Sequence, residues 1–193
     1  MSYKEHQMLI RIKKINPIFF ILLTVCTNEI VYADGVNINS TNTYIDNNIF
    51  YLDASYKLNL TEESYKALRQ GISFEIHMDF QLLEKRKWLW NKIVFKKKLI
   101  HKLEHKPLTK NFLITNLNSG IVNYYKNLDA AVNAIGNISK LRLFDKNKLQ
   151  NNIKYLARIR LYLDIDSLPS PLRPRAYFSS DWNISSQWYR WEI

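Results

Sequence analysis

Two stretches of the chain alternate apolar and polar residues at every position. In residues 72–82 the apolar set is Ile72, Phe74, Ile76, Met78, Phe80 and Leu82. In residues 153–166 it is Ile153, Tyr155, Ala157, Ile159, Leu161, Leu163 and Ile165. This period of two is typical of half-buried antiparallel strands, which turn one face to the core and the other to water. We expect further strands at residues 48–60, 91–104, 110–116 and 120–125, with a hairpin turn at 116–120.

Two short helices interrupt the strands. The first is expected between Thr61, a good N-cap residue, and Gly71, a good helix terminator. The second is expected between Asn127 and Gly136, with its apolar residues on one face. The fold class predicted from these elements is mainly β, bordering on α+β. It is an antiparallel β-sandwich-like domain with two short packed helices.

The expected domain organisation has two parts. Residues 1–33 form a secretory signal peptide, and residues 34–193 form a single β-rich domain. Within that domain, residues 34–47 are polar and are expected to be a loosely ordered lead-in. The segment "LPSPLRP" at 168–174 is expected to be an extended crossing, because proline cannot join a central strand.

The leader has a basic stretch at residues 11–14 followed by an apolar run of about a dozen residues, too short for the roughly 20 residues of a membrane span. Cleavage is expected before Asp34. We therefore expect an exported protein, either periplasmic or peripheral on the cell envelope. A retained anchor or a lipid on Cys26 are the alternatives.

Composition narrows the chemistry. The chain has 193 residues, with 47% hydrophobic and 23% charged residues, which is globular composition. Cys26 is the only cysteine, so the cleaved protein has no disulfide and no cysteine ligand. The formal net charge is +11. For an exported protein this charge favours anionic lipid or acidic envelope polymers over nucleic acid, which we do not expect as a partner. A lysine-rich solvated surface without a dedicated partner is the alternative interpretation of the same charge.

The segment "HKLEH" at residues 101–105 fits a short zinc-peptidase pattern. That pattern needs both imidazoles on one helical turn. The surrounding residues are β-branched, aromatic and basic, with Pro107 immediately after, which favours a strand. On a strand, His101 and His105 lie about 13 Å apart and cannot share one ion.

Glu75, His77 and Asp79 share one face of the strand predicted at 72–82. Such a row can supply an acid, a base or part of a metal site. It is also what the water-facing side of an amphipathic strand looks like, and we prefer this interpretation. We assign no catalytic residue, no cofactor and no metal ligand from the sequence.

A basic tract runs from Lys85 to Lys110 and begins near Trp88 and Trp90. Tryptophan at a membrane interface with lysine on head groups is one interpretation of this tract. Lysines that protect a sheet edge from aggregation are the other.

The tail "SSDWNISSQWYRW" holds three tryptophans. If residues 187–193 form a strand, Trp191 faces the core and Trp188 faces outward beside Arg190. We expect Trp182 to pack in the core as well, because burying an aromatic side chain is strongly favourable. The candidate interaction surface therefore consists of Trp88, Trp90, Trp188 and Arg190.

Four stretches of the chain match one known pattern: "KWLW" at 87–90, "LTKNF" at 108–112, an arginine-rich strand ending in Asp, and above all the tail. On these stretches the chain resembles a bacterial family of exported proteins known as domain of unknown function 4390. The matched positions include Asp164, Pro169, Pro171, Asp181, Trp182, Ser185 and Trp191. Lys87 and Leu89 depart from the family pattern. The resemblance implies no activity, but family genes that lie beside a sensor kinase gene imply a link to a membrane sensor kinase.

The function expected from these observations is a non-catalytic module of the cell envelope that binds a protein partner or an anionic membrane surface. One alternative is a module that binds an envelope glycan or a small acidic ligand through Trp188, Arg190 and the strand face around His77. A second alternative is a periplasmic hydrolase, which requires Glu75, His77 and Asp79 to converge.

Overall fold

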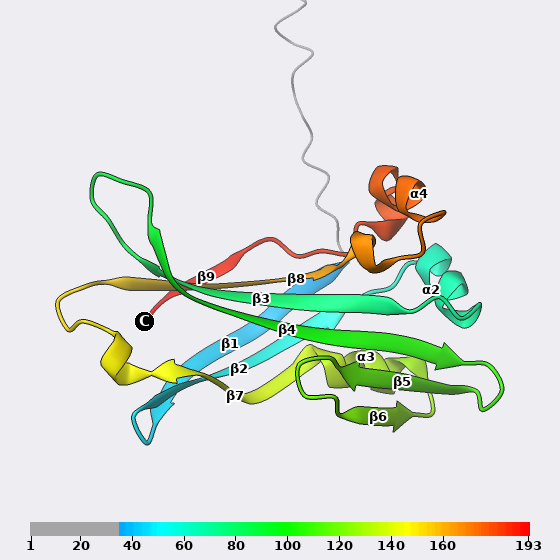
Figure 1. Ribbon diagram of the computed structural model, residues 1–193, viewed down its shortest axis with the longest axis horizontal. Coiled ribbons are helices and arrows are strands. Elements are labelled where there is room, and N and C mark those ends of the chain that lie inside the picture. The colour runs from blue at the N-terminus through cyan, green and yellow to red at the C-terminus, as the bar shows by residue number, and fades with distance from the viewer. Residues whose placement is uncertain (1–34) are drawn as a thin grey trace, which may run out of the picture. The chain divides into compact units, whose positions relative to one another are not determined.

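The computed structural model describes residues 35–193 (Figure 1). The predicted leader, with Cys26, lies outside the described residues. The described chain contains nine strands and three short α-helices in two antiparallel sheets, which confirms a mainly β fold with α+β character. The strands are β1 (Val36–Asp46), β2 (Ile49–Leu58), β3 (Phe74–Glu84), β4 (Lys92–Lys106), β5 (Asn111–Asn116), β6 (Val122–Tyr125), β7 (Asn137–Asp145), β8 (Tyr155–Leu163) and β9 (Tyr189–Glu192).

One sheet has three strands in the order β1-β2-β7, and the other has six in the order β6-β5-β4-β3-β8-β9. The two sheets share one hydrophobic core. Phe95 of β4 and Phe144 of β7 meet in that core, with ring centroids 4.9 Å apart. Trp191 of β9 also reaches the small sheet, where its indole N–H donates to Thr43 Oγ1 of β1 at 3.1 Å.

The alternation in the two long strands is confirmed. From Phe74 to Leu82, every second residue of β3 is buried. The same holds for β8 from Tyr155 to Leu163. These two strands pair with each other inside the six-stranded sheet, and their apolar side chains contribute to the hydrophobic core.

Both predicted helices are present. Helix α2 (Glu62–Arg69) is capped by Thr61, whose side chain accepts from the Ser64 N–H. Helix α3 (Leu128–Gly136) is capped by Asn127, which accepts from the Ala130 N–H. A third helix, α4 (Arg173–Phe178), was not predicted. It replaces part of the extended crossing expected at 168–174, because Pro174 lies in the first turn of a helix, where its missing N–H costs nothing.

The expectation of a loosely ordered lead-in at 34–47 is wrong, because these residues include β1, which pairs with β2 along its length. A bulge between Ile38 and Ser40 shifts the phase of alternation and hides the strand in the sequence. Asn47 and Asn48, both with positive φ, make the two-residue turn that joins β1 to β2.

Candidate functional site

The outer face of the six-stranded sheet carries the most connected polar cluster of the described chain. Strand β3 contributes Glu75, His77 and Asp79, which follow one another on this face as the alternation predicts. The antiparallel register sets Glu75 opposite the residue after β8, Asp164, and sets His77 opposite Tyr162 and Asp79 opposite Arg160. Side chains that are directly opposite in such a pair lie within contact distance.

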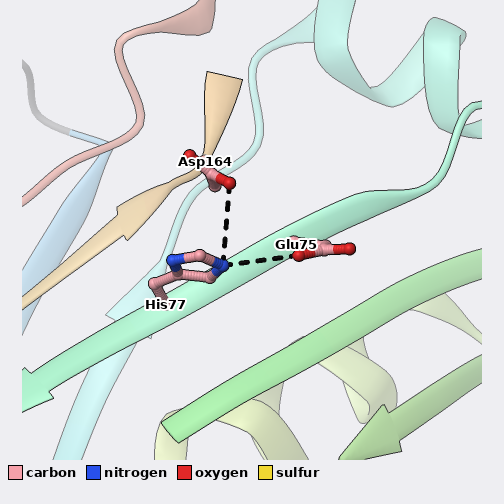
Figure 2. Close-up of side chains that lie close together, drawn as sticks. All are labelled: Glu75, His77 and Asp164. Atoms are coloured by element: carbon pink, nitrogen blue, oxygen red, sulfur yellow. Dashed lines mark hydrogen bonds and ion pairs between the residues drawn. The ribbon is translucent and has the colours of Figure 1, made fainter. Parts of the chain in front are cut away.

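His77 lies between two carboxylates (Figure 2). Its Nε2 atom is 3.4 Å from Glu75 Oε2 and 3.8 Å from Asp164 Oδ2. The Asp164 N–H donates to the Glu75 carbonyl oxygen at 2.9 Å, so backbone pairing holds both carboxylate-bearing residues in place. The other ring nitrogen, Nδ1, is 3.4 Å from the Tyr162 hydroxyl. One imidazole thus joins two carboxylates to a phenol.

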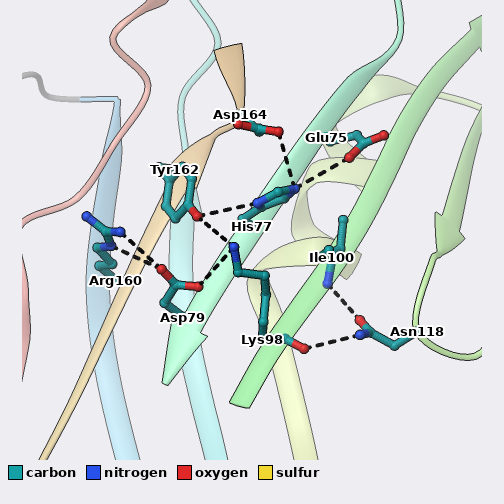
Figure 3. A network of polar contacts seen from close by, with 9 residues as sticks. All are labelled: Glu75, His77, Asp79, Lys98, Ile100, Asn118, Arg160, Tyr162 and Asp164. Atoms are coloured by element: carbon teal, nitrogen blue, oxygen red, sulfur yellow. Dashed lines mark hydrogen bonds and ion pairs between the residues drawn. The ribbon is translucent and has the colours of Figure 1, made fainter. Parts of the chain in front are cut away.

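Asp79 does not join that group but starts a second one (Figure 3). Its carboxylate receives the Arg160 guanidinium at 3.1 Å and lies 3.7 Å from Lys98 Nζ. Lys98 also donates to the Tyr162 hydroxyl at 3.2 Å, which connects the two groups. The three residues Glu75, His77 and Asp79 therefore do not converge as a hydrolase would require, since Asp79 is engaged by two cations.

The outer face of β3 is less exposed to solvent than the sequence predicted. Only 7% of His77 and 9% of Asp79 is exposed, although both side chains point away from the core. Long side chains from the flanking strands cover them, above all Lys98, Arg160 and Tyr162. The preference for a merely water-facing row was therefore wrong for these two residues.

Hydrogen bonding, burial and charge on this sheet face shift the pKa values of two basic residues. The pKa of Lys98 is raised, first by its hydrogen bond to Tyr162 and then by the nearby Asp79 and Asp164 carboxylates, against an opposing effect of burial. The pKa of Arg158 is lowered by burial and by repulsion from Arg190 and Arg160. The lysine stays protonated, and the sheet face beside β9 is strongly cationic.

Trp188 lies on this cationic side of the sheet. The guanidinium carbon of Arg158 is 4.3 Å from the centroid of its ring, and that of Arg160 is 4.8 Å away. Arg190 pairs directly opposite Arg158. The structure therefore brings Trp188 and Arg190 to one face, but two arginines already occupy part of the indole surface that a sugar ring would need.

The other tail tryptophans hold the fold together. Trp182 is 2% exposed, stands edge-on to Phe74 and donates to Glu63 of α2 at 3.1 Å. Trp191 is half-buried, beside Phe80 and bonded to Thr43.

Trp88 and Trp90 are placed very differently, in the loop between β3 and β4, which projects away from both sheets (Figure 1). Their exposed fractions are 95% and 92%. Leu89 between them is also exposed. The structure therefore separates the four residues of the candidate interaction surface, two on this loop and two on the outer face of the sheet.

His101 and His105 lie on β4, as the sequence analysis expected. His105 Nδ1 donates to the Arg69 carbonyl oxygen at 3.3 Å, and its ring packs on Phe112. His101 is half-buried elsewhere along the strand, where burial lowers its pKa. The two imidazoles have separate surroundings.

The remaining tail positions stabilise the segment that returns to the sheet. The Pro169 carbonyl accepts from the Leu172 N–H at 2.9 Å, in the turn that also holds Pro171. The Asp181 carbonyl accepts from the Thr61 hydroxyl at 2.8 Å. Ser185 forms an isolated bridge with Tyr162.

Sequence reasoning missed Tyr162, Lys98 and the role of Asp164 in the cluster. Asp164 had been singled out only as a position of resemblance, at the end of an arginine-rich strand. The pairing of β3 with β8 was the missing signal, because that register alone sets Asp164 beside Glu75.

These features define a class of β-rich domain with a polar network on one sheet face and an exposed aromatic and basic loop. The chain belongs to the family described as a domain of unknown function, DUF4390, whose model matches residues 33–192. No curated protein and no solved structure matches the chain. Within residues 35–193, no helix is both long and apolar enough to span a bilayer.

Proposed function

We propose that this protein is a non-catalytic, exported module of the cell envelope that docks on an anionic membrane surface through the β3–β4 loop. The observation that carries the proposal is the near-complete exposure of Trp88 and Trp90 in the β3–β4 loop, which projects away from both sheets. A fold normally leaves such side chains in water only where they meet a partner. The predicted leader supports a location in the envelope.

The chemistry of the loop suits an interface between lipid and water. Tryptophan concentrates at the head-group level of membranes, where an apolar ring with one polar N–H is best accommodated. Leu89 lies between the two tryptophans in the sequence, and Ile93 and Val94 at the start of β4 are also exposed. Exposed apolar side chains on a loop can enter the head-group region without unfolding the hairpin.

Basic residues surround the two tryptophans. Lys85 and Arg86 precede them, but these are engaged by Glu192 and Glu84. Lys87 and Lys92 make no ion pair within the described part of the chain, so both charges are free to approach lipid phosphates. A basic residue near an anionic surface contributes about 1 kcal/mol. The proposal therefore predicts weak, reversible and salt-sensitive binding.

Sedimentation with lipid vesicles tests the proposal. The wild-type chain is expected to sediment with vesicles of phosphatidylcholine and phosphatidylglycerol, and much less with phosphatidylcholine alone. The W88A/W90A variant is expected to lose this binding. Leu108→Ala is the matched control, because Leu108 is a fully exposed apolar residue in the turn at the other end of β4, between Lys106 and Lys110.

Three results would overturn the proposal. One is a wild-type chain that ignores both kinds of vesicle. Another is a W88A/W90A variant that binds like the wild type. The third is binding to a crosslinked envelope protein that needs Trp88 and Trp90 while vesicles are ignored, which would make the partner a protein instead.

A further inference from the structure

The cluster of Glu75, His77 and Asp164 has no part in the docking proposal, and its geometry has a consequence of its own. Glu75 and His77 come from β3, and Asp164 directly follows its paired strand β8. Figure 2 shows both carboxylates pointing to the same ring nitrogen of His77. One donor atom from each residue lies within 4.8 Å of the other two. Three potential metal ligands therefore surround one point.

The distances fit a tetrahedral ion. Bonds of about 2.0–2.1 Å to zinc place neighbouring ligand atoms roughly 3.4 Å apart. In the cluster, Nε2 of His77 is 3.4 Å from the Glu75 oxygen and 3.8 Å from the Asp164 oxygen. On binding an ion, the Asp164 side chain, which is 26% exposed, would have to rotate to bring its oxygen to this spacing.

The charges also leave room for a cation. Within residues 35–193, neither Glu75 nor Asp164 pairs with a lysine or an arginine, and both carboxylates share only His77. Lys98, the nearest ammonium in the network, is engaged by Tyr162 and Asp79 on the Nδ1 side of the ring. A negative charge thus remains beside Nε2 even when His77 is protonated.

Tyr162 supplies the support that a metal-binding imidazole needs. When Nε2 binds a metal, Nδ1 carries the proton, and here it faces the Tyr162 hydroxyl at 3.4 Å. Partners of this kind fix the tautomer and the ring orientation of metal-binding histidines. Glu75 and Asp164 are 30% and 26% exposed at their side chains, which leaves a path for the ion and a place for water as fourth ligand.

We infer that Glu75, His77 and Asp164 form a binding site for a transition-metal ion, Zn²⁺ in the first place. An imidazole with two carboxylates suits zinc and its neighbours, whereas Mg²⁺ and Ca²⁺ prefer oxygen ligands only. The competing explanation is a protonated His77 that merely bridges two carboxylates. That arrangement needs no metal, so the two explanations differ in a measurable way.

Calorimetric titration of the chelator-treated chain with zinc chloride decides between them. The expected result is binding of one Zn²⁺ per chain, a higher midpoint of thermal unfolding with zinc, and no comparable response to magnesium chloride. Glu75→Gln and Asp164→Asn keep the shape of each side chain and remove its charge. Each is expected to weaken zinc binding by tenfold or more, and Tyr162→Phe by about tenfold or more through the lost support of the ring.

His105→Asn is the matched control, because it removes a half-buried imidazole elsewhere in the same sheet and is expected to leave zinc binding unchanged. His77→Ala should abolish binding, and if that variant fails to fold, E75Q and D164N still decide. The inference is overturned if the wild type binds no zinc at one ion per chain, or if E75Q and D164N both bind as the wild type does. The W88A/W90A variant should bind zinc normally, which keeps this test separate from the docking test.

Discussion

Four of the five tryptophans fall into two regions with opposite surroundings, while the fifth, Trp188, packs against Arg158 and Arg160 on the outer face of the large sheet. In the tail, Trp182 is buried and Trp191 is half-buried, and both indole N–H groups have partners, Glu63 and Thr43. In the β3–β4 loop, Trp88 and Trp90 are almost fully exposed. No hydrogen bond or ring contact to another described residue engages either loop tryptophan.

The difference shows that tryptophans clustered in the sequence can serve either core packing or surface recognition, depending on what lies next to them in the fold. The tail returns across the edge of the large sheet, so its rings meet Phe74 and Phe80 and are used for cohesion. The loop extends past the end of both sheets, where no element of residues 35–193 covers it (Figure 1). Its rings are therefore available for a partner.

Trp182→Ala is the substitution expected to have the largest effect on stability. It removes a fully buried ring and the bond to Glu63, and it leaves a cavity beside Phe74. We expect a loss of about 3–5 kcal/mol in the free energy of unfolding, measured by denaturant titration. Trp90→Ala is the matched control, expected to change that free energy by less than about 0.5 kcal/mol. Equal losses in the two variants would remove the distinction between the regions.

Mild acid is expected to lower the free energy of unfolding of the domain without changing vesicle binding by the loop. The expected loss is smaller than that caused by Trp182→Ala. Burial lowers the pKa of His101 from its usual 6.5, so the unfolded chain binds the proton more readily than the folded chain does. The stabilising contribution is therefore complete above pH 6.5 and declines as the pH falls toward the lower pKa of the folded state. The free energy of unfolding of the wild type should decline over this interval more than that of His101→Gln.

Vesicle binding through the β3–β4 loop should not depend on pH in this interval. The charged residues from Lys85 to Lys92 are lysines and one arginine, and none is a histidine. Vesicle binding per folded molecule should thus be unchanged while stability declines. A His101→Gln variant with the same pH dependence of unfolding as the wild type would assign the effect to other groups.

The sequence predicted the parts of the fold that depend on local pattern. Strands β3 and β8 and the helix capped by Thr61 follow from alternation and capping chemistry. Strand β1 did not, because a bulge breaks its alternation and its inward residues include Thr41 and Thr43. Strand β7 also escaped prediction; Lys140, with positive φ, interrupts it.

The candidate site was only half visible in the sequence for a related reason. Alternation shows that Glu75 and His77 share a face, but it says nothing about which residue of another strand lies opposite. Asp164 is 87 residues beyond His77, and only the β3–β8 register brings the two together. The same limit applies to Trp88, because a sequence pattern alone does not tell whether another element covers a loop.

Tryptophan fluorescence on mixing with vesicles tests the central claim most directly. The claim is that the loop tryptophans serve recognition while Trp182 and Trp191 of the tail serve cohesion. Wild-type emission should shift to shorter wavelength with vesicles that contain phosphatidylglycerol, as Trp88 and Trp90 leave water, and the shift should be absent in W88F/W90F. A shift that persists in W88F/W90F would show that the tail rings meet the membrane, and no shift in the wild type would contradict docking through this loop.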